Sequence, residues 1–208
     1  MYKRQVYGDA ESLPKIESMK ARPLSPYAVS KFADELYGRV FSRVHRLPTV
    51  GLRYFNVFGP RQDPASQYAA VIPKFITWML AGKPPVIYGD GDQSRDFTFV
   101  ENVVNANLLA AGSGASGFSV NIGSGERHSL NELVRLLNDI LGTDFDPVYE
   151  EPRLGDVRHS LAGLEVAGSE VGYAPEIGFR DGLERTVAWL KRDPGGPVSV
   201  QKEADAYS

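Results

Sequence analysis

Residues 25–31 read Ser-Pro-Tyr-Ala-Val-Ser-Lys, and this stretch opens the clearest structural unit of the chain. Its first serine is suited to cap a helix, and the proline that follows is suited to the first helical turn. Apolar residues then recur at helical spacing as far as Pro48, so the sequence predicts an amphipathic helix over 26–46. A short buried strand over 49–54 should follow. This order of elements is typical of α/β proteins.

Helical and strand patterns alternate along the rest of the chain. Helices are expected over 70–81, 101–111, 129–141 and 179–191, with a weakly helical segment over 161–171. Strands are expected over 86–88, 97–100, 117–122 and 147–149, and a loop over 56–60. Ser129 and Glu132 have the spacing of a capping box. Proline, glycine, serine and charged residues dominate 193–208, so this tail is expected to be disordered.

The composition excludes several classes of chemistry. The chain has 208 residues, is 42% hydrophobic and carries a net charge of -3, which is ordinary for a globular protein with no nucleic-acid partner. It contains no cysteine, and its three histidines lie far apart, so no metal site is expected. No apolar run approaches the roughly 20 residues that cross a membrane. Residues 1–5 do not resemble a signal peptide, so we expect a cytoplasmic protein without a membrane partner.

Tyr27 and Lys31 are the strongest candidates for catalysis. They lie four residues apart, which places both side chains on one face of the predicted helix. A nearby ammonium group favours the phenolate form of a tyrosine. Such a tyrosine can exchange a proton with a sugar hydroxyl while a cofactor takes or returns hydride. The pair by itself is a weak signal, because the same spacing arises by chance on helices whose lysine is simply solvated.

Five motifs in a fixed order strengthen this interpretation. They are Val6-Tyr-Gly-Asp9, Ser25-Pro-Tyr-Ala-Val-Ser-Lys31, Leu52-Arg-Tyr-Phe-Asn-Val-Phe-Gly-Pro-Arg61, Tyr88-Gly-Asp-Gly91 with Ser94-Arg-Asp-Phe97, and Arg153-Leu-Gly-Asp156. In this order they resemble the NAD-dependent epimerase/dehydratase family of extended short-chain dehydrogenases/reductases. Within that family the chain is most similar to the bacterial UDP-N-acetylglucosamine and UDP-glucose 4-epimerases. The resemblance extends over about 6–191.

The resemblance implies an α/β fold with two parts. One is the C-terminal part of a Rossmann-type doubly wound parallel sheet, and the other is a smaller α/β substrate-binding domain. Residues 1–60 would be the remnant of the NAD-binding Rossmann domain, with the catalytic helix and the strand after it. Residues 61–192 would form mainly the substrate-binding region, except that 102–122 would return to the Rossmann sheet.

The resemblance also implies roles for individual residues. Tyr27 would be the acid/base, and Lys31 would bind the nicotinamide ribose and lower the pKa of the tyrosine. Contacts to NAD are implied for Tyr27, Lys31, Tyr54 and Phe55. Contacts to a UDP-sugar are implied for Asn56, Gln67, Tyr68, Val86, Tyr88, Arg95, Arg153, Asp156 and Ser160.

Within this set the chemistry differs from residue to residue. Arg95 and Arg153 would clamp the diphosphate, because a guanidinium group can bind two phosphate oxygens at once. Asn56 would bind the diphosphate or the sugar, and Ser160 would leave space for an N-acetyl group, which favours UDP-N-acetylglucosamine and its galacto epimer. Each residue also has a simpler interpretation: a surface charge for the arginines, a turn for Asn56, a solvent-facing position for Ser160, and a core aromatic for Tyr88.

Two features of the family are missing from the sequence. No Gly-x-x-Gly-x-x-Gly turn is present to cradle the NAD pyrophosphate, and no serine or threonine precedes Tyr7 where the family has its third catalytic group. We therefore expect an N-terminally truncated epimerase that is inactive alone, with an open edge on the strand 49–54. The homodimer of the family is doubtful, because one of its two interface helices would be missing. The alternatives are a dehydratase or another epimerase of the same family, or a UDP-sugar-binding module without catalysis.

Overall fold

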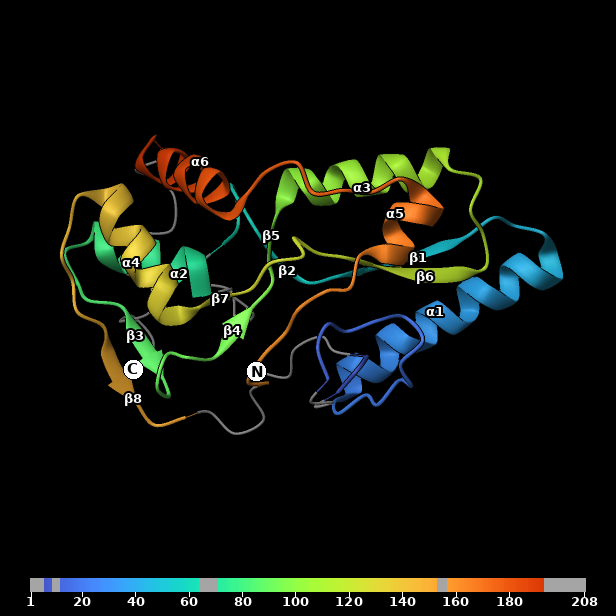
Figure 1. Cartoon of the computed structure of the whole chain (residues 1–208), viewed down its shortest axis with the longest axis horizontal. Helices are drawn as coiled ribbons and strands as arrows, with labels where there is room; N and C mark the ends of the chain where they lie inside the picture. Colours follow the sequence, from blue (N-terminus) through green and yellow to red (C-terminus); the bar gives the residue numbers. More distant parts are fainter. Residues whose placement is uncertain (1–5, 9–11, 64–70, 153–156, 193–208) are drawn as a thin grey trace, which may run out of the picture.

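The computed structural model describes residues 6–8, 12–63, 71–152 and 157–192 (Figure 1). Its helices are α1 (Pro26–His45), α2 (Val71–Leu80), α3 (Val100–Gly112), α4 (Leu130–Leu141), α5 (Glu165–Val171) and α6 (Phe179–Arg192). Its strands are β1 (Val50–Tyr54), β2 (Asn56–Phe58), β3 (Val86–Tyr88), β4 (Ser94–Arg95), β5 (Phe97–Phe99), β6 (Phe118–Ile122), β7 (His128–Ser129) and β8 (Val148–Glu150). The chain is therefore an α/β protein, as the sequence predicts.

One half of the molecule is built on two parallel strands with helices on both sides. β1 and β6 pair in parallel from Val50 opposite Phe118 to Tyr54 opposite Ile122. Figure 1 shows α1 below this pair, and α3 and α5 above it. Val120 and Ile122 of β6 are fully buried against α3 and α5. Among the described residues β1 has no strand on its other side, so one edge of this sheet is open.

The other half is a closed apolar core under three helices. Buried residues of α2, α4 and α6 form one apolar cluster with Phe97 and Phe99 of β5, and α4 contacts both α2 and α6. Phe58 lies at the centre, where its ring makes edge-on contacts with those of Phe99 and Phe179. Gly182 on α6 allows this approach, because a side-chain carbon there would lie 2.9 Å from the rings of Phe58 and Phe99. We call this half the closed lobe.

Most predicted elements are confirmed within a residue or two. The capping box is present, since the Ser129 hydroxyl accepts from the Glu132 backbone and the Glu132 carboxylate accepts from the Ser129 backbone. The loop expected over 56–60 is wrong in its first half, because β2 pairs in parallel with β5 there. The predicted strand over 97–100 ends at Phe99, and α3 begins at the next residue.

The segment predicted as weakly helical over 161–171 forms helix only from Glu165. Its first residues instead give their backbone donors to distant partners. Ala162 donates to the Asp96 carboxylate, and Gly163 donates to the Lys15 carbonyl. The tail predicted to be disordered lies outside the described residues.

Helix α1 differs from the other long helices in how little of it is buried. Ala28 is its one buried residue, although the sequence predicts an amphipathic helix. Large apolar side chains along it are exposed: Val29, Leu36, Tyr37, Val40, Phe41 and Val44. No helix in the described part of the chain is both long and apolar enough to cross a membrane.

Candidate functional site

A cavity of about 640 Å³ lies between α1 and β1. From α1 it is lined by Tyr27, Lys31, Asp34, Glu35, Gly38 and Arg39. All five residues of β1 contribute, together with Phe55, Asn56 and Val57 that follow the strand. Val6, Tyr7, Thr49, Gln62, Arg95, Phe118 and Val157 complete the lining. The cavity therefore lies along the open edge of β1.

The start of α1 fixes the position of Tyr27 at the cavity wall. The Ser25 hydroxyl accepts from the Ala28 backbone N–H at 3.1 Å, and Pro26 occupies the first turn, so the helix begins one residue before Tyr27. Tyr27 is 47% exposed. The Lys31 Nζ atom lies 5.9 Å from the centre of its ring. The structure thus places both predicted catalytic groups on the same wall.

Lys31 also has an anionic partner that the sequence analysis did not identify. Its Nζ donates to the Asp34 carboxylate at 2.7 Å. This hydrogen bond raises the pKa of Lys31 above its ordinary value. Both side chains are more than half exposed, so the contact is a solvated ion pair that a ligand can displace at small cost.

A buried polar network joins α1 to the sheet. Arg53 of β1 donates from two nitrogens to both Glu35 carboxylate oxygens, at 2.8 and 2.7 Å, and each side chain is only 9% exposed. Arg53 also donates to the Tyr7 hydroxyl at 2.7 Å, and Ser119 donates to Glu35. Burial lowers the pKa of Arg53, but the Glu35 hydrogen bond and the Tyr7 contact outweigh it and the net shift is upward. The network sets where α1 lies relative to β1.

Tyr7 connects this network to the far strand. Its hydroxyl donates to the side-chain oxygen of Asn121 on β6. The Asn121 amide nitrogen donates in turn to the carbonyls of Lys15 and Gly163. Burial raises the pKa of Tyr7, although the positive charge of Arg53 opposes this. The chain before α1 is therefore held against both strands.

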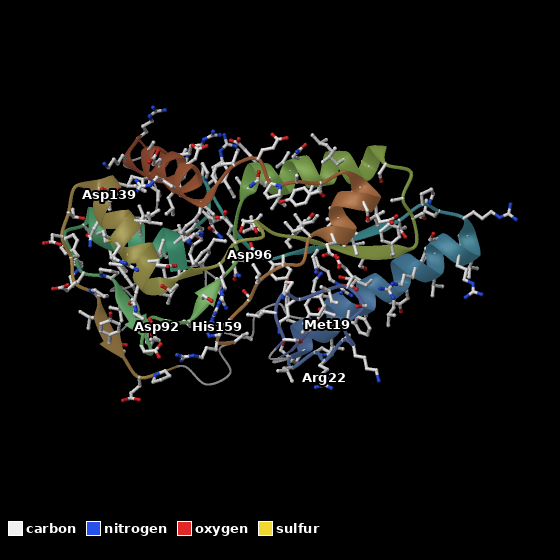
Figure 2. The ribbon with its side chains drawn as sticks, in the orientation of Figure 1. Met19, Arg22, Asp92, Asp96, Asp139 and His159 are labelled. Carbon is white, nitrogen blue, oxygen red and sulfur yellow. The ribbon has the colours of Figure 1, made fainter. Side chains whose placement is uncertain are left out.

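Asp96 lies between the two halves of the molecule (Figure 2). Its carboxylate is fully buried. It accepts hydrogen bonds from the backbone N–H groups of Ser124, Gly125 and Ala162 and from the hydroxyls of Thr98 and Ser124. Burial raises the pKa of Asp96, and these hydrogen bonds work against the increase. Asp96 thus joins three segments that are distant in sequence.

His159 lies within the electrostatic influence of three arginine side chains. Burial lowers the pKa of His159, and the charges of Arg127, Arg158 and Arg95 lower it further. The His159 Nδ1 atom lies 2.9 Å from the Ser94 hydroxyl. Arg95 lines the cavity, and its Nη1 donates to the carbonyls of Ser94 and Arg158. Of these three arginines Arg95 lines the cavity, and Arg158 is paired with the Asp90 carboxylate.

The structure brings together six of the predicted site residues. Those that line the cavity are Tyr27, Lys31, Tyr54, Phe55, Asn56 and Arg95. Val86, Tyr88 and Ser160 do not line it; the first two lie on β3, and Ser160 is fully buried, so its solvent-facing interpretation is wrong. Gln67, Tyr68, Arg153 and Asp156 lie outside the described residues.

Sequence reasoning missed the residues of the buried network. A charged residue such as Arg53 within an apolar strand must find a partner, since an unpaired buried charge is costly. Glu35 lies one helical turn beyond Lys31, so its position on the cavity face could have been inferred. Tyr7 belongs to the Val6-Tyr-Gly-Asp9 motif, but no signal in the sequence indicated its contact with Arg53. No cluster of three or more potential metal ligands occurs among the residues that the structure describes.

More than half of the chain matches a known protein family. The family model described as "NAD dependent epimerase/dehydratase family" matches residues 4–123, more than half of the chain. The chain belongs to this family. Its resemblance to the family, inferred from the five motifs, is thus confirmed.

Individual relatives cover most of this chain. A putative UDP-glucose 4-epimerase from Methanocaldococcus jannaschii is 39% identical over 90% of the chain and 60% of its own length. The solved UDP-N-acetylglucosamine 4-epimerase from Methanobrevibacter ruminantium, in complex with UDP-N-acetylmuramic acid, is 44% identical with a TM-score of 0.86, over 90% of this chain and 60% of that one. A dTDP-glucose 4,6-dehydratase from Actinoplanes is 34% identical, over 90% and 58%. The chain therefore spans about 60% of the length of these relatives.

The described residues fit one end of an NAD molecule. Tyr27, Lys31, Tyr54 and Phe55 all line the cavity, where a phenol, an ammonium and aromatic rings can hold a nicotinamide and its ribose. The pyrophosphate end is different. The sequence contains no glycine-rich turn of the kind that receives a pyrophosphate at a helix N-terminus. The fit is therefore limited to the nicotinamide side.

Proposed function

We propose that this chain forms the acid/base and substrate-binding part of an NAD-dependent epimerase that inverts C4 of a UDP-hexose. The observation that carries the proposal is the position of Tyr27 and Lys31 on the wall of one cavity that Asn56 and Arg95 also line. Membership of the epimerase/dehydratase family supports it. We further propose that residues 1–60 and 102–122 belong to the Rossmann part, which the parallel pairing of β1 with β6 supports.

In this proposal each group has one task. Tyr27 takes a proton from the C4 hydroxyl of the sugar and later returns one, and Lys31 favours the ionised tyrosine by its positive charge. When bound, NAD would accept a hydride from C4 of the sugar and later return it. Arg95 holds the diphosphate, and Arg153 is assigned to the same task. The 4-keto sugar then rotates within the site, so that the hydride is returned to its other face.

The sugar that we propose is N-acetylated. Ser160 is small and lies directly behind Asn56, so this part of the wall is free of the bulk that an aromatic residue would add. UDP-N-acetylglucosamine and UDP-N-acetylgalactosamine are the expected pair. The complex of the M. ruminantium epimerase with UDP-N-acetylmuramic acid supports this choice, because that ligand also carries an N-acetylated sugar.

Two alternative functions would use the same site but would not epimerise the sugar. A dehydratase would release water from the sugar, which the dTDP-glucose 4,6-dehydratase among the relatives supports. A binding module would hold the UDP-sugar without turnover.

One set of measurements separates these outcomes. Calorimetric titration with UDP, UDP-N-acetylglucosamine and NAD is followed by incubation of the sugar with NAD and mass analysis of the product. We expect this chain to bind the UDP-sugar and to turn it over only when extended to the length of its relatives. Loss of water from the product would replace the epimerase with a dehydratase. Absence of UDP-sugar binding would contradict the proposed function.

A further inference from the structure

The side-chain amide of Asn56 is held by two acceptors inside the protein. Its Nδ2 donates to the backbone carbonyl of Asp96 at 3.2 Å and to the Ser160 hydroxyl at 3.3 Å. A carbonyl oxygen can only accept a hydrogen bond, so the nitrogen of the amide, and not its oxygen, must face Asp96. The orientation of this amide is therefore determined by the chemistry of its neighbour.

The two internal contacts use both N–H groups of the amide. An asparagine amide has two such donors and one oxygen that accepts. Within the described part of the chain no hydrogen bond reaches the Asn56 oxygen. Asn56 is half-buried and lines the cavity. The polar group that it can still offer to a ligand is thus an acceptor.

Ser160 is fixed in place by its own backbone. Its N–H donates to the Ser94 carbonyl at 3.1 Å, and two residues later the Ala162 N–H donates to the Asp96 carboxylate at 3.1 Å. Ser160 is fully buried and does not line the cavity. Any influence of its hydroxyl on a ligand must therefore pass through Asn56.

We propose that Ser160 is a positioning residue, which together with the Asp96 carbonyl turns the Asn56 oxygen toward the cavity. Asn56 then recognises a hydroxyl or amide N–H of the sugar, and not the diphosphate. Phosphate oxygens at neutral pH are acceptors, and two acceptors facing each other repel. This inference rests on the proposed function for the identity of the ligand. It gives Ser160 a second role, the orientation of Asn56, beside the space that its small side chain leaves.

The orientation can be measured without any ligand. In the ¹⁵N-labelled chain the two Asn56 side-chain protons are identified by their loss in Asn56→Ala, and their exchange with solvent is followed. Both protons should be protected in the wild type, and in Ser160→Ala one of them should exchange at least about tenfold faster, because its acceptor is gone. Equal exchange in both proteins would overturn the proposal.

A matched variant controls for the loss of a buried hydroxyl. Thr186 on α6 is also buried, and its hydroxyl donates to the Gly182 carbonyl at 2.7 Å, in the closed lobe. Thr186→Ala should leave both Asn56 protons protected. Faster exchange in this variant would mean that general loosening, and not the Ser160 hydroxyl, controls the amide.

Ligand recognition is tested by calorimetry with UDP and UDP-N-acetylglucosamine. In Ser160→Ala the Kd for the UDP-sugar should rise about 3- to 10-fold, the value of one oriented hydrogen bond, while the Kd for UDP stays within about twofold. Equal weakening of both ligands would place Asn56 at the diphosphate and overturn the proposal, as would no change in either. If the wild type binds no UDP-sugar, the proposed function fails, and the exchange measurement alone then decides the orientation of Asn56.

Discussion

The closed lobe and the α1–β1 region are stabilised in different ways. In the closed lobe, side chains such as Phe58, Ile76 and Leu137 are at most 1% exposed, and three helices cover them. Helix α1 buries one residue, and a polar network holds it to the sheet. The closed lobe is thus stabilised mainly by apolar packing. The α1–β1 region depends on a few directed contacts, which leave room for a cavity beside the proposed catalytic pair.

The largest effect is expected from breaking the network under α1. Glu35→Ala leaves the guanidinium of Arg53 buried without its carboxylate, so the free energy of unfolding should fall by about 3–5 kcal/mol. Urea denaturation measures this change. Asp139→Ala, which breaks the exposed pair with Arg180, is the matched control and should leave the free energy of unfolding nearly unchanged. Equal effects in the two variants would show that the network does not hold α1.

Truncation of an apolar side chain should destabilise the closed lobe much more than the α1–β1 region. Leu137→Ala in α4 removes a fully buried side chain and should cost about 2–5 kcal/mol. Leu36→Ala on α1 removes a side chain that is 45% exposed and should change stability by about 0.5 kcal/mol or less. A large loss from Leu36→Ala would mean that α1 is packed against something in solution, and sedimentation analysis would then identify a dimer.

Helix capping provides a smaller comparison. Ser129→Ala removes the hydroxyl that accepts from the Glu132 backbone in the capping box of α4 and should cost about 0.5–2 kcal/mol. Ser25→Ala removes the cap of α1, with a cost in the same range. Only the second variant should also increase amide hydrogen exchange in the first turn of α1, next to Tyr27. Faster exchange in the first turn of α1 in Ser129→Ala would contradict the separate behaviour of the two regions.

The smallest effect concerns stability at high pH. Burial raises the pKa of Tyr7 and of Tyr173 above the ordinary value of 10.0. Above pH 10 the unfolded chain has lost protons that the folded chain keeps, so the free energy of unfolding falls as pH rises, by at most about 1.4 kcal/mol per pH unit for each tyrosine. Tyr173→Phe should reduce this slope.

Much of the fold follows from local signals in the sequence. The capping box of α4 and the Ser-Pro start of α1 involve residues within three positions of each other, so their pattern can be recognised directly. β2 was missed because its strand identity depends on pairing with β5, some 40 residues away. Strands this short are stabilised by their partners more than by their own composition.

The candidate site, like the fold, can be predicted from the sequence only where it depends on local patterns. The positions of Tyr27 and Lys31 on one face follow from helical periodicity. The contact between Asn56 and Ser160 joins residues that are 104 positions apart, and no local pattern predicts it. The roles of Asp96 and Arg53 likewise depend on segments that meet only in the folded chain. Tertiary contacts of this kind are outside the reach of periodicity and capping rules.

Tyr27→Phe tests the central claim most directly. Turnover of UDP-N-acetylglucosamine is measured with NAD in a chain extended to the length of its relatives, and calorimetry measures the affinity for the same UDP-sugar. Removal of the acid/base should lower turnover by about 10²- to 10⁴-fold, while the Kd for the UDP-sugar stays within about twofold of that of the unsubstituted protein. Turnover of Tyr27→Phe at the rate of the unsubstituted protein would contradict the account.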